Sequence, residues 1–235
     1  MKLKYYEPKA EIVIEPKASE QLKGSFDNVL ELIAYCARVS NPENQFNNET
    51  AEKLIRYLIR HKHWSPLEMA SITVGVDTTR DIAHQIVRHR SLKFQEFSQR
   101  YASPEALDAM FVLREARLQD TKNRQNSIET DDEALKQWWE EAQREVIALA
   151  YEKYSEAVNV KGIAKECARA ILPEGNTASR VYMAGDIRSW IHYIELRSAN
   201  GTQKEHMELA RVVAQAISQI FPMVEEFNGE NNDNN

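Results

Sequence analysis

Residues 69–102 read MASITVGVDTTRDIAHQIVRHRSLKFQEFSQRYA, and this stretch decides the fold. Its first eight residues alternate between apolar and polar or small side chains, which predicts a β-strand. Residues 80–90 predict a short helix with Thr78 or Thr79 as its N-cap. Residues 96–102 predict a second strand. Helix and strand therefore follow each other within one short segment of chain.

The sequence on either side adds further elements, although residues 103–130 have no clear pattern. The predicted elements are strands at 3–6, 11–15 and 179–185, and helices at 26–40, 50–63, about 131–158, 163–172, 186–197 and 203–220. We expect an α+β fold, with a single domain at 1–227 whose mixed or antiparallel sheet is flanked by helices, one of them the long helix near 131–158. The polar residues 228–235 are expected to form a disordered tail.

The composition is that of an ordinary globular protein. Hydrophobic residues make up 43% and charged residues 28% of the 235 residues, which excludes disorder over the whole chain. No apolar run approaches the roughly 18 residues that a membrane span needs, and the N-terminus shows no secretory signal. Two cysteines, Cys36 and Cys167, make no disulfide framework, so a cytoplasmic location is expected.

The charge is unevenly distributed along the chain. Thirty Lys and Arg against 36 Asp and Glu give a net charge of −6, which is unsuited to coating nucleic acid. Residues 80–101 are nevertheless locally basic, which predicts an anionic small-molecule ligand. With seven glycines, and with neither GxGxxG nor GxxxxGK[ST] present, the sequence disfavours a Rossmann or P-loop nucleotide site.

Residues 88–101, RHRSLKFQEFSQRY, concentrate groups that bind anions and nucleotides. Arginine forks bind phosphate and carboxylate groups in bidentate fashion. Arg88 and Arg90 alone could simply complement the dipole at a helix C-terminus. That explanation does not cover the polar side chains crowded between Phe94, Phe97 and Tyr101.

This string resembles the R-H-R-x-x-S-x-N-x-x-S-x-R signature of flavin-dependent thymidylate synthases. Arg88, His89, Arg90, Ser98 and Arg100 match at the right spacing. The sequence departs from the pattern at two positions, with Lys93 in place of Ser and Gln95 in place of Asn.

Three more blocks extend the resemblance in the right order. They are residues 37–40 (ARVS), residues 61–68 (HKHWSPLE), and residues 168–173 (ARAILP) followed by 186–188 (DIR), His192, Leu196 and Arg197. The family usually has Asn where Asp186 stands. Four ordered blocks support the resemblance far better than one motif does.

The resemblance implies an enzyme that makes dTMP from dUMP without a cysteine nucleophile. Methylenetetrahydrofolate would supply the one-carbon unit, and FAD reduced by NADPH the hydride. It also implies a homotetramer with shared active sites. Neither nucleic acid nor a membrane is expected as a partner.

The resemblance also implies a set of site residues. The expected catalytic residues are Arg197 beside the pyrimidine, His63 near the flavin ring and folate, and Ser98 in substrate binding or ring activation. The expected cofactor-binding residues are Ser40, Ser65, Arg88, His89, Arg90, Glu96, Arg188 and His192. The expected substrate-binding residues are Gln85, Glu96, Phe97, Ser98, Gln99, Arg100, Arg169 and Arg197. No metal site is expected, and Glu68 either contacts flavin or stabilises its turn.

Some residues have structural interpretations instead. Cys36 and Cys167 lie in apolar helix stripes and are expected to be buried and inert. Trp138 and Trp139 are expected in the core or between subunits, and His206 is expected on a solvated face.

Two alternative functions belong to other classes. One is a single-stranded nucleic-acid-binding module that stacks bases on Phe94, Phe97 and Tyr101. The other is a metal-dependent nucleotide phosphohydrolase. The acidity of the chain and the supporting sequence blocks weigh against the first.

Overall fold

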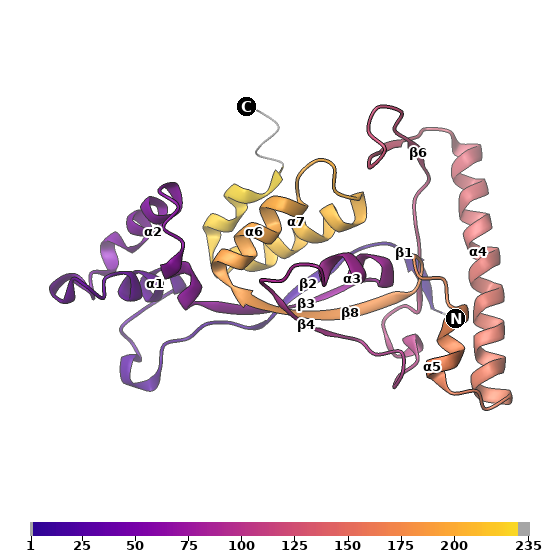
Figure 1. The fold of residues 1–235 in the computed structure, drawn as a ribbon, viewed down its shortest axis with the longest axis horizontal. Coiled ribbons are helices and arrows are strands. Elements are labelled where there is room, and N and C mark those ends of the chain that lie inside the picture. Colours follow the sequence, from indigo (N-terminus) through magenta and orange to yellow (C-terminus); the bar gives the residue numbers. More distant parts are fainter. Residues whose placement is uncertain (1, 230–235) are drawn as a thin grey trace.

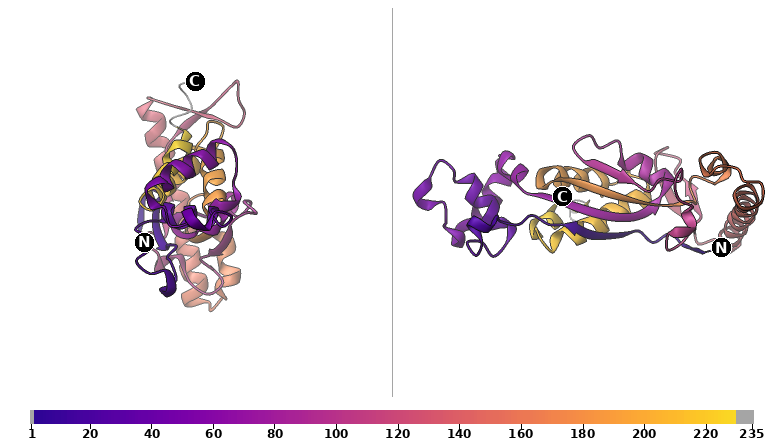
Figure 2. Two further views of the ribbon diagram at one scale, coloured as in Figure 1. Left: turned by 90° about the vertical axis from the view of Figure 1, so that its left-hand side faces the viewer. Right: turned by 90° about the horizontal axis from the view of Figure 1, so that it is seen from below.

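The computed structural model describes residues 2–229 and shows an elongated molecule built around a four-stranded sheet (Figures 1 and 2). The strand order is β2 (Lys9–Ile14), β3 (Ser71–Thr79), β8 (Ala178–Asp186) and β4 (Lys93–Glu96), and all neighbours are antiparallel. The predicted α+β class with an antiparallel sheet and flanking helices is confirmed.

The main core lies on one face of this sheet, under α6 (Ile187–Arg197) and α7 (Lys204–Ser218) (Figure 1). The alternation of β3 buries Ile72, Val74 and Val76 on that face. Trp190 of α6 is fully buried, and its Nε1 donates to the carbonyl oxygens of Ile72 and Gly185. The short helix α3 (Arg80–Ile86) buries Ile82, Ala83 and Ile86 in the same core.

One end of the molecule is formed by α1 (Val29–Ala37) and α2 (Ala51–Arg60) (Figure 1). Asn28 caps α1, because its side chain accepts a hydrogen bond of 3.1 Å from the Glu31 amide. After α2 a 3-10 turn at Ser65–Met69 leads into β3. Two further 3-10 turns, Pro42–Asn44 and Asn48–Thr50, lie between the two helices.

The other end is formed by the long helix α4 (Glu133–Ser155), which continues into a π-helical turn at Glu156–Val160. This confirms the long helix predicted at about 131–158. Asp132 caps it by accepting a hydrogen bond from the Leu135 amide. A second, smaller core joins α4 to β5 (Phe111–Leu113), which pairs in parallel with β1 (Leu3–Tyr5).

Several predicted elements have different limits in the structure. The strand predicted at 96–102 is β4, at Lys93–Glu96, and it is followed by a turn in which the Tyr101 amide donates to the Ser98 carbonyl oxygen. The helix predicted at 163–172 is divided into α5 (Lys165–Ala168) and a 3-10 turn at Arg169–Ile171. Residues 103–130 contain a 3-10 turn at Pro104–Ala106, then β5, and then a hairpin of β6 (Arg117–Gln119) and β7 (Ser127–Glu129).

The C-terminal part of the described chain packs onto α6. A 3-10 segment at Pro222–Phe227 is followed by Asn228, which is buried. The amide of Gly229 donates to Ser198 Oγ at 2.8 Å. Asn228 and Gly229 are thus part of the packed structure, although the predicted tail begins at 228. The rest of that tail, 230–235, lies outside the described residues.

Within residues 2–229, none of the helices combines the length and apolar character that crossing a membrane requires.

Candidate active site

The basic motif lies in a loop that the sheet holds in place. Arg88, His89 and Arg90 follow α3 directly, and Leu92 then packs onto β8 over Gly185. A Cβ atom at Gly185 would lie 2.3 Å from Leu92 Cδ2, so a side chain at position 185 would force the Leu92 side chain to move. The absence of a side chain at Gly185 therefore leaves room for Leu92 to pack onto β8.

His89 points into the protein, whereas Arg88 and Arg90 are exposed. The Nε of Arg197 donates to His89 Nε2 at 2.8 Å, and the edge of the His89 ring contacts Tyr193 with centroids 4.9 Å apart. Burial and the Arg197 cation lower the pKa of His89 to about 4. At neutral pH His89 is therefore a neutral acceptor that orients the Arg197 guanidinium.

Gln85, at the end of α3, is held by two residues of the α7 region. Its Oε1 lies 3.2 Å from His206 Nδ1, and its Nε2 donates to Gln203 Oε1 at 2.7 Å. His206 is fully buried, so its predicted position on a solvated face is wrong. It precedes Leu209 and Ala210 by three and four residues, and this helical spacing places all three on the buried face.

The stretch after β4 carries several of the predicted substrate residues. The carboxylate of Glu96 pairs with Arg80 and accepts a hydrogen bond from Ser179 Oγ at 3.0 Å. Gln99 is buried, and among residues 2–229 its Nε2 has no hydrogen-bond partner. A buried amide nitrogen in this state is a natural contact for a bound ligand.

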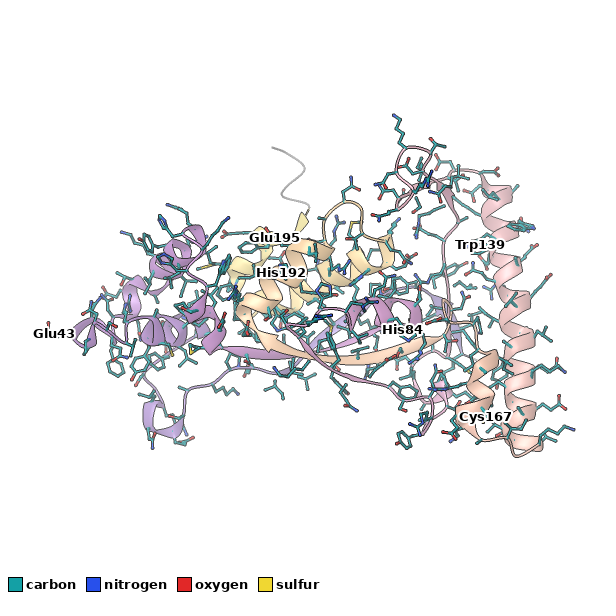
Figure 3. The ribbon with its side chains drawn as sticks, in the orientation of Figure 1. Glu43, His84, Trp139, Cys167, His192 and Glu195 are labelled. Atoms are coloured by element: carbon teal, nitrogen blue, oxygen red, sulfur yellow. The ribbon has the colours of Figure 1, made fainter. Side chains whose placement is uncertain are left out.

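Arg100 and Arg169 lie at the α4 end of the molecule. Arg100 forms an ion pair of 3.3 Å with Glu166 of α5, and the 3-10 turn that contains Arg169 begins three residues later. Cys167, in α5, is exposed (Figure 3), so the predicted burial of this thiol is wrong. The cause is that α5 has only four residues and forms no apolar stripe. Cys36 is half-buried, and burial raises the pKa of its thiol.

A cavity of about 630 Å³ lies between α6 and the turn before β3. Arg188 and His192 of α6 line it, together with Lys62, Ser91 and Trp64. The guanidinium, ammonium, imidazole and hydroxyl groups are donors suited to phosphate oxygens, and the indole offers an apolar wall. Arg188 also forms an ion pair with Glu68, so that Glu68 positions a wall of the cavity.

His63, Ser65 and Ser40 are all exposed, and each follows α1 or α2 closely in the chain. The His63 ring lies 6.2 Å from the rings of Tyr57 and His61, between centroids, so the three rings form one exposed aromatic group. In the described part of the chain, no three His, Cys, Asp or Glu side chains gather in a way that could hold a metal ion.

The predicted residues thus fall into three groups along the long axis. The first lies near α1, α2 and the cavity, the second around Gln85, His89 and Arg197, and the third beside α5. Figure 3 shows His192 on α6, well separated from Cys167 at the α4 end. One copy of the chain therefore does not gather all of these residues around a single cavity.

The sequence missed the residues behind the site. Tyr193, Gln203 and His206 carry polar groups that contact predicted site residues or each other. Lys62, Trp64 and Ser91 line the cavity, and all lie inside or beside the quoted sequence blocks, which is the signal that could have identified them.

Comparisons with known proteins give a consistent result. A family model described as "Thymidylate synthase complementing protein" matches residues 21–223. A probable flavin-dependent thymidylate synthase of Paramecium bursaria Chlorella virus 1 is 54% identical over 194 residues, which cover 83% of this chain and 88% of that protein. The flavin-dependent thymidylate synthase of Synechocystis sp. (strain ATCC 27184 / PCC 6803 / Kazusa) is 50% identical over 193 residues, with coverage of 82% and 86%.

The fold also matches a solved structure. A UMP/dUMP methylase, PolB from Streptomyces cacaoi, bound with 5-Br dUMP, aligns with a TM-score of 0.77 at 25% identity. The alignment covers 97% of this chain and 96% of that one.

Proposed function

Because this chain belongs to the family of flavin-dependent thymidylate synthases, we propose that the three groups of residues are parts of the site in which dUMP is methylated to dTMP. The relatives' names make the enzyme a flavin-dependent methyltransferase. We propose FAD as the flavin, with NADPH and methylenetetrahydrofolate as co-substrates. The observation that carries this conclusion is identity of 50 and 54% to two such synthases over more than four fifths of the chain.

Arg197 is the proposed catalytic residue at the pyrimidine. Uracil C5 is a poor nucleophile, so reaction there requires donors that stabilise negative charge developing on the ring. His89 occupies the Nε of Arg197 and leaves the two terminal nitrogens of the guanidinium to donate to the pyrimidine. Because the donor is already oriented, little reorganisation is needed when the charge develops. Ser98 is proposed beside it, in substrate binding or ring activation.

The remaining nucleotide contacts are proposed at Gln85, Glu96, Phe97, Gln99, Arg100 and Arg169. The unpartnered, buried Nε2 of Gln99 supports a ligand contact in this stretch. Arg100 and Arg169 offer guanidinium groups for the dUMP phosphate, and the exposed Glu166 is the carboxylate that the phosphate would replace at Arg100.

The cavity beside α6 is the proposed site of the flavin dinucleotide, and its lining also includes the carboxylates of Glu68, Asp186 and Glu195. Its donors, Lys62, Ser91, Arg188 and His192, match the acceptor oxygens of a pyrophosphate. We assign Arg188 and His192 to this cofactor, with Ser40, Ser65, Arg88, His89, Arg90 and Glu96 as further contacts, and His63 near the flavin ring and folate. When bound and reduced by NADPH, FAD supplies the hydride. The ion pair between Arg188 and Glu68 lies in the lining of this cavity.

A homotetramer with shared sites is part of the proposal. Its support is that the three residue groups are separated along one chain. A neighbouring subunit would bring residues of different groups together in one site. The proposed small-molecule partners are dUMP, folate and NADPH. A cytoplasmic location is also proposed, in keeping with two unpaired cysteines.

The test is an anaerobic reaction of the purified protein with NADPH, methylenetetrahydrofolate and dUMP. We expect a yellow protein that forms dTMP and that does so after loss of both thiols. A colourless protein with steeply salt-dependent affinity for oligonucleotides would refute the proposal, as would phosphate release that depends on added divalent metal.

A further inference from the structure

A chain of polar side chains runs behind the proposed nucleotide site, and apart from Gln85 its members have no part in the reaction described above. It starts at Glu205, near the beginning of α7, and ends at Tyr193 of α6. Glu205, His206 and Tyr193 are almost fully buried, with exposed fractions of 3%, 0% and 0%. Burying such groups costs free energy unless they are hydrogen-bonded, so their arrangement needs an explanation.

The first member of the chain is a fixed carboxylate. Arg117 donates to Glu205 Oε1 at 2.7 Å, and Arg114 forms an ion pair of 3.2 Å with Oε2. These guanidinium groups outweigh burial and keep the pKa of Glu205 below its ordinary value. An ionised carboxylate only accepts hydrogen bonds.

The carboxylate sets the direction of each following bond. Because Glu205 Oε2 accepts, the Gln203 amide turns its Nε2 toward it, at 2.9 Å. The Oε1 of Gln203 then faces Gln85 and accepts from Gln85 Nε2. Since the amide of Gln85 is now oriented, its Oε1 faces His206 and accepts from Nδ1–H.

The far end of the chain agrees with this direction. With its proton on Nδ1, His206 presents a lone pair at Nε2, which accepts from the Tyr193 hydroxyl at 3.2 Å. Burial lowers the pKa of His206 to about 3, so the ring is neutral at working pH. Each hydrogen bond of the chain therefore has one donor and one acceptor. The donor and acceptor of these bonds cannot exchange roles while Glu205 is charged, because an ionised carboxylate only accepts.

We propose that Glu205, Gln203 and His206 are positioning residues that fix the amide orientation of Gln85 for binding dUMP. The proposal rests on the proposed contact of Gln85 with the nucleotide. The chain occupies one N–H and one oxygen lone pair of the Gln85 amide. The second N–H and the second lone pair therefore face the ligand in one orientation, without the entropy cost of selecting it on binding.

The experiment uses Gln203→Met in the full-length, flavin-loaded enzyme. The substitution keeps the length of the side chain and leaves the ion pairs of Glu205 in place. We expect the KM for dUMP to rise about fivefold, which corresponds to the net free energy of one lost hydrogen bond. We expect kcat and the flavin absorbance to stay unchanged. The matched control is Gln215→Met, the same change at an exposed position of α7. It should leave all three quantities at the wild-type values.

A double-mutant cycle with Gln85→Met separates the two proposals. If Gln85 contacts the nucleotide, Gln85→Met raises the KM for dUMP, and adding Gln203→Met raises it no further. A rise with Gln85→Met but none with Gln203→Met overturns the positioning proposal and leaves the contact standing. No rise with Gln85→Met refutes the contact itself and, with it, the positioning proposal.

A second variant tests the same proposal at another residue, in case a substitution at position 203 impairs folding. His206→Phe keeps a planar ring, although a larger one, and removes the donor to Gln85. It should show the same rise in KM, and the rise should again disappear in the Gln85→Met background. Equal, additive losses of kcat in both backgrounds would show a merely structural effect and overturn the proposal.

Discussion

Acidification should destabilise this protein through His206, and the size of the effect follows from its burial. The side chain is 0% exposed, and burial together with the nearby Arg197 and His89 lowers its pKa from the ordinary 6.5 to about 3. Below pH 6.5 the unfolded chain binds a proton at this position, whereas the folded chain does not until about pH 3. The neutral, buried imidazole of His206 therefore contributes its full stabilisation above pH 6.5. This contribution is lost progressively as the pH falls from the pKa of the unfolded chain towards that of the folded chain.

The magnitude is measurable. Each pH unit inside the window costs about 1.4 kcal/mol, so the step from pH 7 to pH 5 should lower the free energy of unfolding by about 2 kcal/mol through this residue. The assay is urea unfolding at both pH values and at one fixed protomer concentration, because assembly also contributes to apparent stability. The compared quantity is the difference between the two pH values, not the stability at either one.

Two variants show whether His206 is the cause. His206→Phe should reduce the difference between pH 7 and pH 5 by about 2 kcal/mol, whatever it does to stability at pH 7. Tyr193→Phe removes the hydrogen bond to His206 Nε2 but keeps the imidazole, so it should retain the difference. The reasoning fails if His206→Phe loses as much stability between the two pH values as the wild type does.

Further predictions concern the reaction. Arg197→Lys keeps the charge but loses the guanidinium fork, so kcat should fall on the order of a hundredfold in assays of dTMP formation. Arg88→Ala should lose flavin absorbance as well as activity, because an exposed guanidinium for the cofactor is removed; an inactive protein with its full flavin content would contradict this assignment. The double variant Cys36→Ala, Cys167→Ala should keep its turnover, and complete loss in a folded protein would restore a thiol mechanism.

Local patterns predict the elements whose burial follows a simple period. The alternation of residues 69–76 identifies β3, and the long helical pattern near 131–158 identifies α4, because each element buries one face against a core. The same patterns predict the wrong limits for β4, because they place this strand at 96–102 instead of Lys93–Glu96. Its residues are assigned by pairing with β8, a strand more than eighty residues away, and local sequence has no access to that pairing.

The motif identifies the residues that contact ligands better than those that support them. Exposed arginines such as Arg88 stand out as charges in an otherwise acidic chain. Gln203 and His206 are ordinary polar residues in sequence, and their importance depends on contacts with Gln85, more than a hundred residues earlier. His89 belongs to the motif, yet only the fold shows that it faces Arg197.

The spread of the site residues along the molecule has a genetic consequence. A chain defective in Arg188 is damaged at the cavity beside α6, whereas a chain defective in Arg169 is damaged beside α5. If neighbouring subunits each supply one of these parts, a mixed assembly of the two defective chains contains some sites built from intact parts alone. Two inactive alleles of one gene should then restore thymidylate synthesis when expressed together, while either allele alone does not.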